Sequence, residues 1–277
     1  MNAGVRSSTP ELRVAIGGFG AIGQAVAARL DRGEPGLRLA AVSARDHAKA
    51  EVNMASYRRK VPVLALGELA DHADVVVECA PAAVFREVAE PALRAGRIFL
   101  PLSVGALLRH GDLIELAEKN GGRILVPTGA LLGLDAVRAA AQGEIDSVTM
   151  VTRKPPAGLE GAPYLVENGI DVSALTKPKK IFDGSAREGA RGFPANVNVA
   201  AALSLAGIGP DRTRLEIWAD PGISRNVHRI RVEADSARFE MTIENVPSGE
   251  NARTGKITAL SALAALKGLT ATLKVGS

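Results

Sequence analysis

A glycine-rich turn near the start of the chain constrains the fold more than any other feature. Residues 13–23 read R-V-A-I-G-G-F-G-A-I-G, and an apolar helical pattern over residues 24–30 follows at once. Gly18, Gly20 and Gly23 therefore have the spacing G-x-G-x-x-G, with a predicted strand before them and a predicted helix after them. This order predicts the first strand, turn and helix of a parallel α/β domain.

Each glycine of this turn has its own physical reason. The first permits a tight turn, the second lets the backbone approach a pyrophosphate, and the third lets helix and strand pack closely. The N–H groups at the helix start, with the positive end of the helix dipole, then face the phosphates. The spacing alone is a weak signal in a chain with 29 glycines, but its position after the first strand predicts a bound dinucleotide and redox chemistry. The expected cofactor contacts in the turn are Gly18, Phe19, Gly20, Ala21, Ile22 and Gly23.

Strand and helix patterns alternate through the rest of the first half, which predicts βαβ units and a parallel sheet. The predicted strands are residues 37–42, 61–66, 74–80, 97–102 and 123–127, and the predicted helices are residues 82–95 and 105–120.

Past Ala136 the pattern changes to longer strands with alternating apolar and polar residues. The short connection from Glu233 to Ser236 predicts an antiparallel hairpin, and residues 155–178, rich in Gly, Pro and Lys, are predicted to form a mobile loop. The predicted strands here are residues 147–154, 213–219, 228–234 and 237–246, and the predicted helices are residues 197–205 and 254–267.

The predicted fold class is α/β, with a Rossmann dinucleotide-binding domain and a second α+β domain that has a mainly antiparallel sheet. The first domain is expected over residues 1–130 and the second, for substrate and oligomerisation, over residues 131–251. The C-terminal helix, about residues 252–277, is expected to pack back on the first domain. Exposed edges of an antiparallel sheet further predict a homodimer.

Composition excludes several classes of function. Among 277 residues the net charge is +4, but the basic residues are scattered and not interleaved with aromatics, so neither nucleic acid nor a membrane is an expected partner. Instead, a basic surface attracts anionic small molecules. Cys79 is the only cysteine, which excludes an intrachain disulfide and a cysteine-based zinc site, and no metal is expected. Residues 1–10 lack the apolar core of a signal peptide, so a cytoplasmic location is expected.

The end of the second predicted strand bears on the choice between NAD and NADP. An acidic residue there binds the ribose 2′-hydroxyl of NAD in many such sites, but here the strand continues Val42-Ser43-Ala44-Arg45-Asp46. Arg45 either accepts a 2′-phosphate or faces solvent, and Asp46 serves NAD only if the strand runs longer. The cofactor is therefore predicted as NAD or NADP, with a slight preference for NADP or for dual use, and Ser43 and Arg45 are predicted contacts.

A set of short motifs, most of them in the second half, carries a family resemblance. They are G-G-F-G-A-I-G at 17–23, E-C-A at 78–80, P-T-G-A at 127–130, G-L-D at 133–135, K-P-P at 154–156, N-V-N-V-A-A at 196–201, A-D-P at 219–221, N-V-H at 226–228 and E-N-V-P-S-G-E-N at 244–251. In this order, over nearly the whole chain, they closely resemble the L-aspartate dehydrogenase family.

The resemblance implies NAD(P)-dependent oxidation of L-aspartate to iminoaspartate. That imine hydrolyses to oxaloacetate and ammonia or feeds the quinolinate route of pyridine nucleotide biosynthesis. By position, His228 corresponds to the catalytic histidine, and Ala130 and one asparagine of the N-V-N pair correspond to cofactor contacts, with Asn198 favoured and Asn196 as the alternative. One departure is that the usual N-P-x-T-S is Asn251-Ala252-Arg253-Thr254-Gly255 here.

The chemistry of amine oxidation names further candidates. Imidazole titrates near neutral pH, which suits His228 as acid and base. Two substrate carboxylates require a cation, for which Lys154 is the first candidate and Arg225 the second, and for each the alternative is a solvated surface residue. Strand alternation points Arg229 away from the side that His228 faces.

Other site residues follow from position. One asparagine of the N-V-N pair is at a position suited to capping the helix, and Asn198 is expected to bind substrate at the helix start. Cys79 and Ala80 end a strand at the cofactor edge and are expected to pack beside the nicotinamide. The sequence leaves two alternatives to the oxidation of aspartate. One is the same fold acting on another small amino dicarboxylate or a semialdehyde, and the other is a non-catalytic NAD(P)-binding sensor.

Overall fold

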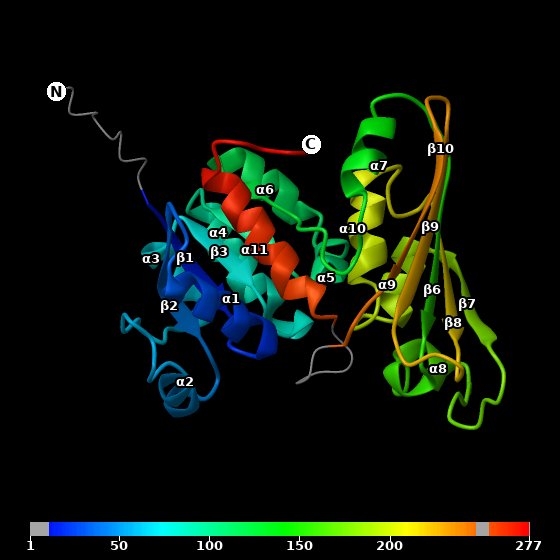
Figure 1. Cartoon of the computed structure of the whole chain (residues 1–277), viewed down its shortest axis with the longest axis horizontal. Coiled ribbons are helices and arrows are strands. Elements are labelled where there is room, and N and C mark those ends of the chain that lie inside the picture. Colours follow the sequence, from blue (N-terminus) through cyan, green and yellow to red (C-terminus); the bar gives the residue numbers. More distant parts are fainter. Residues whose placement is uncertain (1–10, 248–254, 277) are drawn as a thin grey trace. The chain divides into compact units, whose positions relative to one another are not determined.

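The structure is a computed structural model that describes residues 11–247 and 255–276. The chain divides into two compact units, each built on one five-stranded sheet (Figure 1). The first unit comprises the chain up to Leu100 together with residues 113–125 and 263–274, and the second comprises residues 101–112, 126–262 and 275–277. The predicted features of residues 1–10, 248–254 and 277, among them the end of the E-N-V-P-S-G-E-N motif, lie outside the described residues.

The sheet of the first unit has the strand order β2-β1-β3-β4-β5. The pairs β1–β2, β1–β3 and β4–β5 are parallel. Val14 to Ile16 and Val75 to Val77 are completely buried, as continuous apolar runs are in a parallel sheet that is covered on both faces. The strands are β1 (Leu12–Gly17), β2 (Leu37–Ser43), β3 (Val75–Glu78), β4 (Ile98–Pro101) and β5 (Arg123–Ile124).

Six helices contribute to this unit among the described residues, and the last of them returns from the far end of the chain. From Leu263 onward α11 belongs to the first unit, where Thr270 Oγ1 donates a hydrogen bond to Pro35 O at 3.1 Å. Lys267 Nζ lies 3.3 Å from the carboxylate of Glu34. The helices are α1 (Ala21–Arg32), α2 (His47–Asn53), α3 (Leu69–His72), α4 (Phe85–Arg94), α6 (Asp112–Asn120) and α11 (Ile257–Thr270), and single 3-10 turns cover Leu66–Glu68 and Ala82–Val84.

The sheet of the second unit has the strand order β10-β9-β6-β8-β7. Strands β9 and β10 form the predicted antiparallel hairpin, and the pairs β6–β9 and β7–β8 are also antiparallel. The pair β6–β8 is parallel, so this sheet is mixed. The strands are β6 (Ile145–Lys154), β7 (Lys179–Ser185), β8 (Thr213–Ala219), β9 (Val227–Ala234) and β10 (Arg238–Glu244).

One face of this second sheet, here called the inner face, packs against helices (Figure 1). Alternate residues of β6, β8 and β9 are buried there, among them Met150, Leu215 and Ile230, while their neighbours in sequence point to the other, outer face. The helices are α5 (Val104–Leu107), α7 (Leu134–Ala140), α8 (Pro163–Glu167), α9 (Ala186–Gly192) and α10 (Asn198–Ala206), and a 3-10 turn covers Pro156–Gly158.

Several predicted elements differ from those observed. Residues 61–66 form no strand and contribute only a bridge from Val63 to Val42. The helix predicted over residues 105–120 is two helices, α5 and α6, and the stretch predicted as a loop over residues 155–178 contains α8. Strand β7 and helices α2, α7 and α9 were not predicted. The sequence of β7, K-K-I-F-D-G-S, puts charges at both ends of a short apolar pair and hides the period of two.

Candidate active site

Two of the three glycines in the turn between β1 and α1 leave no room for a side chain. Gly18 has φ +101°, and a Cβ there would lie 2.6 Å from the backbone of Cys79. At Gly23 a Cβ would lie 2.1 Å from the carbonyl oxygen of Gly18. Both positions therefore require glycine for the close packing of β1, β3 and α1.

Gly20 differs, because no heavy atom lies within 4 Å of the position that its Cβ would take. It is the N-cap of α1, a helix whose start has no side-chain cap and no acidic residue in its first turn. The first turn of α1 thus contributes no carboxylate of its own to the positive end of the helix dipole. An open backbone surface at a helix start fits the pyrophosphate of a dinucleotide.

Strand β2 ends at Ser43, whose carbonyl oxygen accepts a hydrogen bond from Gly18 N at 3.1 Å. Asp46 is the N-cap of α2 and accepts from Lys49 N at 2.9 Å. The longer strand under which Asp46 would serve NAD is therefore not formed. Arg45 is exposed in the short connection between β2 and α2.

Cys79 directly follows β3 and lies against the glycine turn. Its backbone N–H donates to Gly17 O at 2.7 Å. Burial, with a smaller contribution from the charge of Glu78, raises the pKa of the Cys79 thiol well above its usual value. A protonated thiol is a poor nucleophile, which supports a packing role for Cys79 and for the buried Ala80 beside it.

Polar side chains gather at one end of the inner face of the second sheet. Thr152 and Lys154, on β6, are 2% and 5% exposed, and His228, on β9, is 3% exposed. Thr152 and His228 are direct partners in the antiparallel register of β6 and β9. A residue two positions further along a strand points to the same face, so Lys154 shares this face with Thr152.

The imidazole of His228 has one polar contact within the sheet and one cation nearby. Its Nδ1 lies 3.1 Å from Thr152 Oγ1. Burial, and then the positive charge of Lys154, lowers the pKa of His228 to about 3. The ring is therefore neutral at neutral pH and has a lone pair with which to accept a proton.

Lys154 is buried, so the alternative reading of it as a solvated surface cation is wrong. Its Nζ donates a hydrogen bond to Asn196 Oδ1 at 2.7 Å. Its carbonyl oxygen accepts from Asp220 N at 2.8 Å. The Asp220 carboxylate in turn accepts from Gly222 N at 2.9 Å and from Arg153 on the outer face at 3.2 Å. The end of β6 is thereby held in place at the residue that carries the ammonium group.

The two asparagines of the N-V-N pair have different roles in the structure. Asn196 contacts Lys154, whereas Asn198 Oδ1 accepts a hydrogen bond from Gly105 N, in α5, at 3.0 Å. The expected capping by an asparagine of this pair is not observed, because α10 begins at Asn198 itself and its N-cap is Val197 without a side-chain hydrogen bond. Asn198 thus joins α10 to α5, and Asn196 joins the group around His228.

The two arginines that flank His228 in sequence are both exposed. Arg225 is exposed in the connection between β8 and β9. Arg229 points to the outer face, as strand alternation predicts, and its Nε donates to Thr242 Oγ1 at 3.4 Å.

Asn245 connects the end of β10 to the segment that contains Ala130. Its backbone N–H donates to Asn226 O at 2.9 Å, and its side-chain Nδ2 donates to Ala130 O at 3.1 Å. Its Oδ1 is buried and has no hydrogen-bond partner among the described residues. A Cβ at Gly255 would lie 2.9 Å from this oxygen, so the glycine that ends the altered N-A-R-T-G stretch packs closely on Asn245.

Thr152 and Asn245 are the residues of this group that sequence reasoning missed. Thr152 lies two positions before Lys154 in a strand pattern, which puts both on one face. Asn245 lies within the E-N-V-P motif. Neither signal identifies a partner, because both partners come from distant parts of the chain.

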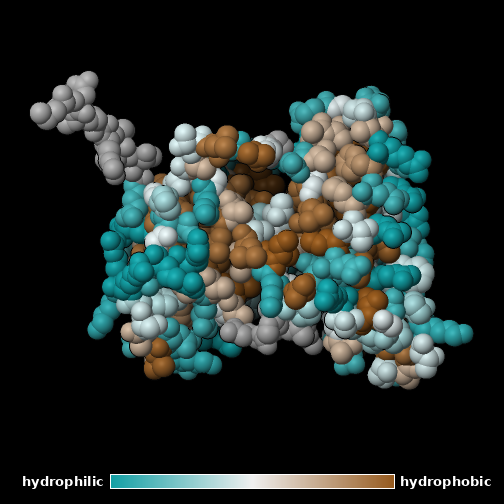
Figure 2. Space-filling view, in the orientation of Figure 1, coloured by the Kyte–Doolittle hydropathy of each residue, from teal (hydrophilic) through white to brown (hydrophobic). Residues whose placement is uncertain are grey.

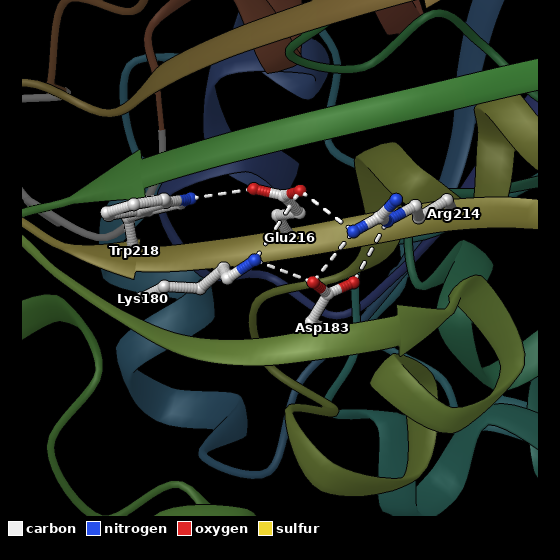
Figure 3. Close-up of polar contacts among 5 residues, drawn as sticks. All are labelled: Lys180, Asp183, Arg214, Glu216 and Trp218. Carbon is white, nitrogen blue, oxygen red and sulfur yellow. Dashed lines mark hydrogen bonds and ion pairs between the residues drawn. The ribbon is translucent and has the colours of Figure 1, made fainter.

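The outer face of the same sheet carries a different kind of polar cluster (Figure 3). Arg214 Nη2 and Lys180 Nζ lie 2.8 Å and 2.6 Å from Asp183 Oδ2, and Trp218 Nε1 donates to Glu216 at 3.1 Å. Hydrogen bonds from Arg214 and Lys180 lower the pKa of Asp183 to about 2. These partly exposed pairs join β7 to β8, and Figure 2 shows mostly hydrophilic residues along the border of this unit where Figure 1 places β7 and β10.

No group of three or more His, Cys, Asp or Glu side chains in residues 11–247 and 255–276 is arranged to hold a metal ion. In the same part of the chain, no helix has the length and apolar character needed to cross a membrane.

Two successive parts of the chain match known protein families. Residues 18–127 match the model for the NAD-binding domain of homoserine dehydrogenase, and residues 135–269 match the model for the C-terminal domain of aspartate dehydrogenase. A solved structure of aspartate dehydrogenase from Thermotoga maritima superposes with a TM-score of 0.72 over 96% of this chain and 99% of that one. At 22% identity this likeness concerns the fold, and it confirms the predicted α/β class with a Rossmann domain.

Two curated relatives match over almost their whole length. The chain is 58% identical over 272 residues to an L-aspartate dehydrogenase of Bradyrhizobium diazoefficiens, covering 98% of this chain and 96% of that protein. It is 57% identical over 272 residues to L-aspartate dehydrogenase 3 of Bordetella bronchiseptica, covering 98% of this chain and all of that protein. The resemblance carried by the short motifs is confirmed, and the chain belongs to the L-aspartate dehydrogenase family.

Proposed function

We propose that this protein oxidises L-aspartate to iminoaspartate with NAD(P)+ as the hydride acceptor. The observation that carries the proposal is the buried pair of a neutral imidazole at His228 and an ammonium group at Lys154. Two electrons and one proton leave the Cα–H bond as a hydride, and a second proton leaves the amine nitrogen. The products are the imine, the reduced cofactor and a proton, and water then converts the imine to oxaloacetate and ammonia.

His228 is the acid and base of this reaction. The bound cofactor supplies the electrophilic C4 that accepts the hydride, and the turn of Gly18, Gly20 and Gly23 is the part of this chain that fits its pyrophosphate. The neutral imidazole accepts the proton that the substrate ammonium must lose before its nitrogen lone pair can drive hydride departure. The same group returns a proton when the reaction runs in reverse.

Lys154 binds a carboxylate of the substrate. A buried ammonium that already has a short hydrogen bond to Asn196 can add a charge-assisted hydrogen bond to an anion. Burial is the larger cause of the low pKa of His228, and the positive charge of Lys154 is the smaller one. Bringing a carboxylate to Lys154 offsets that charge, so substrate binding makes the base stronger. Arg225 and Asn198 are proposed as further substrate contacts, and Ala130 and the asparagine pair as contacts of the nicotinamide half.

For the cofactor we propose use of NADP, alone or with NAD. Asp46 is engaged as the cap of α2, and Arg45 directly before it is exposed. An arginine at this place accommodates a 2′-phosphate.

For the two predicted domains we propose that residues 1–130 bind the cofactor and that residues 131–251 bind the substrate.

We also propose a homodimer that works in the cytoplasm and supplies iminoaspartate for pyridine nucleotide biosynthesis. Strands β7 and β10 are the sheet edges that support the dimer proposal. The single cysteine, Cys79, supports a reducing compartment. Light scattering on the purified protein tests the dimer.

The activity is tested by following absorbance at 340 nm with L-aspartate and NAD+ or NADP+, and in reverse with oxaloacetate, ammonia and the reduced cofactor. We expect turnover by the wild type, and a loss of about 1000-fold or more in His228→Ala. His72→Ala, at an exposed helix end, is the control. Turnover of another amino acid but not of aspartate would reject the substrate, and cofactor binding without any turnover would reject the reaction.

A further inference from the structure

The inner face of the second sheet changes from apolar to polar residues at the same position along the neighbouring strands β6 and β9. On β6, Val148 and Met150 are each 1% exposed, and the next residue on this face is Thr152. On β9, Ile230 and Val232 are fully buried, and the residue before them on this face is His228. The two polar residues are direct partners in the antiparallel register, so the change occurs at the same place on both strands.

A buried hydroxyl at this place needs an explanation. Valine has nearly the shape of threonine and occupies other inner positions of β6 and β9 without the cost of removing a hydroxyl from water. At Thr152 the hydroxyl oxygen lies 3.1 Å from Nδ1 of His228, which satisfies both groups. On the neighbouring strand β10, the residue directly across from His228 is Ile243, whose side chain has no hydrogen-bonding group.

The protonation of the ring determines the direction of this hydrogen bond. A neutral imidazole has one N–H, so one nitrogen donates and the other accepts. A base needs its lone pair on the nitrogen that faces the substrate. With Thr152 Oγ1 on Nδ1, that nitrogen is Nε2, and a lone pair on Nε2 requires the proton of the resting ring to lie on Nδ1.

We propose that Thr152 is the positioning residue of His228: its Oγ1 accepts a hydrogen bond from Nδ1–H and thereby holds the ring in the tautomer whose Nε2 lone pair faces the substrate. When Nε2 takes a proton, Nδ1 keeps its own, and Thr152 continues to accept from the imidazolium. The proposed effect of Thr152 on catalysis rests on the proposed role of His228. The tautomer of the resting ring does not depend on the substrate.

Thr152→Val and Thr152→Ser form the matched pair for the test. Thr152→Val keeps the shape and removes the hydroxyl, and Thr152→Ser keeps the hydroxyl. The ring of His228 is observed by 15N NMR of histidine-labelled protein without ligand, and its signals are assigned by their loss in His228→Gln. We expect Nδ1–H and a non-protonated Nε2 in the wild type and in Thr152→Ser, and a shift of the population toward Nε2–H in Thr152→Val.

Steady-state kinetics give the second measurement. We expect kcat for aspartate to fall about 10-fold to 100-fold in Thr152→Val, with the KM of the cofactor within about twofold of the wild type. Thr152→Ser should recover kcat to within about threefold of the wild type. Thermal unfolding of both variants shows whether the sheet is intact.

Two results would overturn the proposal: a wild-type ring with its proton on Nε2, or a Thr152→Val protein with unchanged ring signals and unchanged kcat. If Thr152→Val does not fold, the wild-type tautomer and the Thr152→Ser kinetics still decide. Absence of any amino acid oxidation by the wild type would reject the proposed function and leave the tautomer measurement valid, so the two failures are distinguishable.

Discussion

Lys154 Nζ donates a hydrogen bond to Asn196 Oδ1 at 2.7 Å, although the two residues are 42 positions apart. Lys154 ends β6, and Asn196 precedes α10, so this contact joins the polar end of the sheet to the start of a helix that packs on it. Both the ammonium group and the imidazole of His228 are buried on this face. The pair provides a cation and a hydrogen-bonding amide next to a base.

Replacing Lys154 by methionine should affect substrate affinity most. The variant keeps an unbranched side chain and loses the charge that pairs with a substrate carboxylate, so KM for aspartate should rise about 10-fold to 100-fold. Binding of NADP+, measured by fluorescence titration, should stay within about twofold. Lys177→Met, at an exposed loop position, is the control. An unchanged KM would show that Lys154 has a structural role only.

Replacing each of the two asparagines by alanine should affect different properties of the protein. Asn196→Ala removes the acceptor for Lys154 and should raise KM for aspartate several-fold. Asn198→Ala leaves Gly105 N without its acceptor, so it should lower the free energy of unfolding by about 1–2 kcal/mol. Urea unfolding and steady-state kinetics on both variants give the comparison. The reverse pattern would assign the substrate contact to Asn198.

His228 should make the stability depend on pH in acid. Its pKa is about 3 in the folded protein against an ordinary value of 6.5, so the unfolded chain binds the proton first as the pH falls. The contribution is complete above pH 6.5 and is lost progressively between pH 6.5 and 3. Between pH 7.5 and 4.5 the wild type should lose about 2 kcal/mol more than His228→Gln.

The measurement is urea unfolding at several pH values, which compares slopes and not absolute stabilities. His72→Gln makes the same replacement at an exposed position, and its curve should follow that of the wild type. Parallel curves for the wild type and His228→Gln would contradict the low pKa of this histidine in the folded protein.

Gly20 and Gly23 should respond differently to the same change to alanine. Gly23→Ala places a Cβ 2.1 Å from a carbonyl oxygen, which should cost about 3 kcal/mol or prevent folding. Gly20→Ala places a Cβ in open space and should change stability by about 0.5 kcal/mol. Because that space is where we place the pyrophosphate, Gly20→Ala should weaken NADP+ binding about 10-fold. Unchanged binding would place the cofactor elsewhere.

Arg45 should control the choice of cofactor. Arg45→Gln removes the charge that we assign to the 2′-phosphate, so kcat/KM for NADP+ should fall about 10-fold while kcat/KM for NAD+ changes by less than about twofold. Arg59→Gln, another exposed arginine of the first unit, is the control. Equal effects on both cofactors would show that Arg45 does not bind the 2′-phosphate of NADP+.

Much of the fold follows from local patterns in the sequence. The turn at Gly18 to Gly23 is predictable because the strand, the glycines and the helix that meet there are adjacent in the chain. The hairpin of β9 and β10 is predictable for the same reason. Strand β7 is not, because its partner is β8 and its burial comes from side chains that arrive from elsewhere in the second unit.

By itself, the sequence determined the family, the dinucleotide motif and the identity of His228 as the candidate base. Each of the three can be recognised from a short run of neighbouring residues. Only the tertiary structure decided that Thr152 faces His228, that Asn196 and not Asn198 contacts Lys154, and that Asp46 is engaged as a helix cap. The physical reason is distance along the chain. Hydrogen-bond partners and burial depend on which strands and helices pack together, and spacing in the sequence does not contain that information.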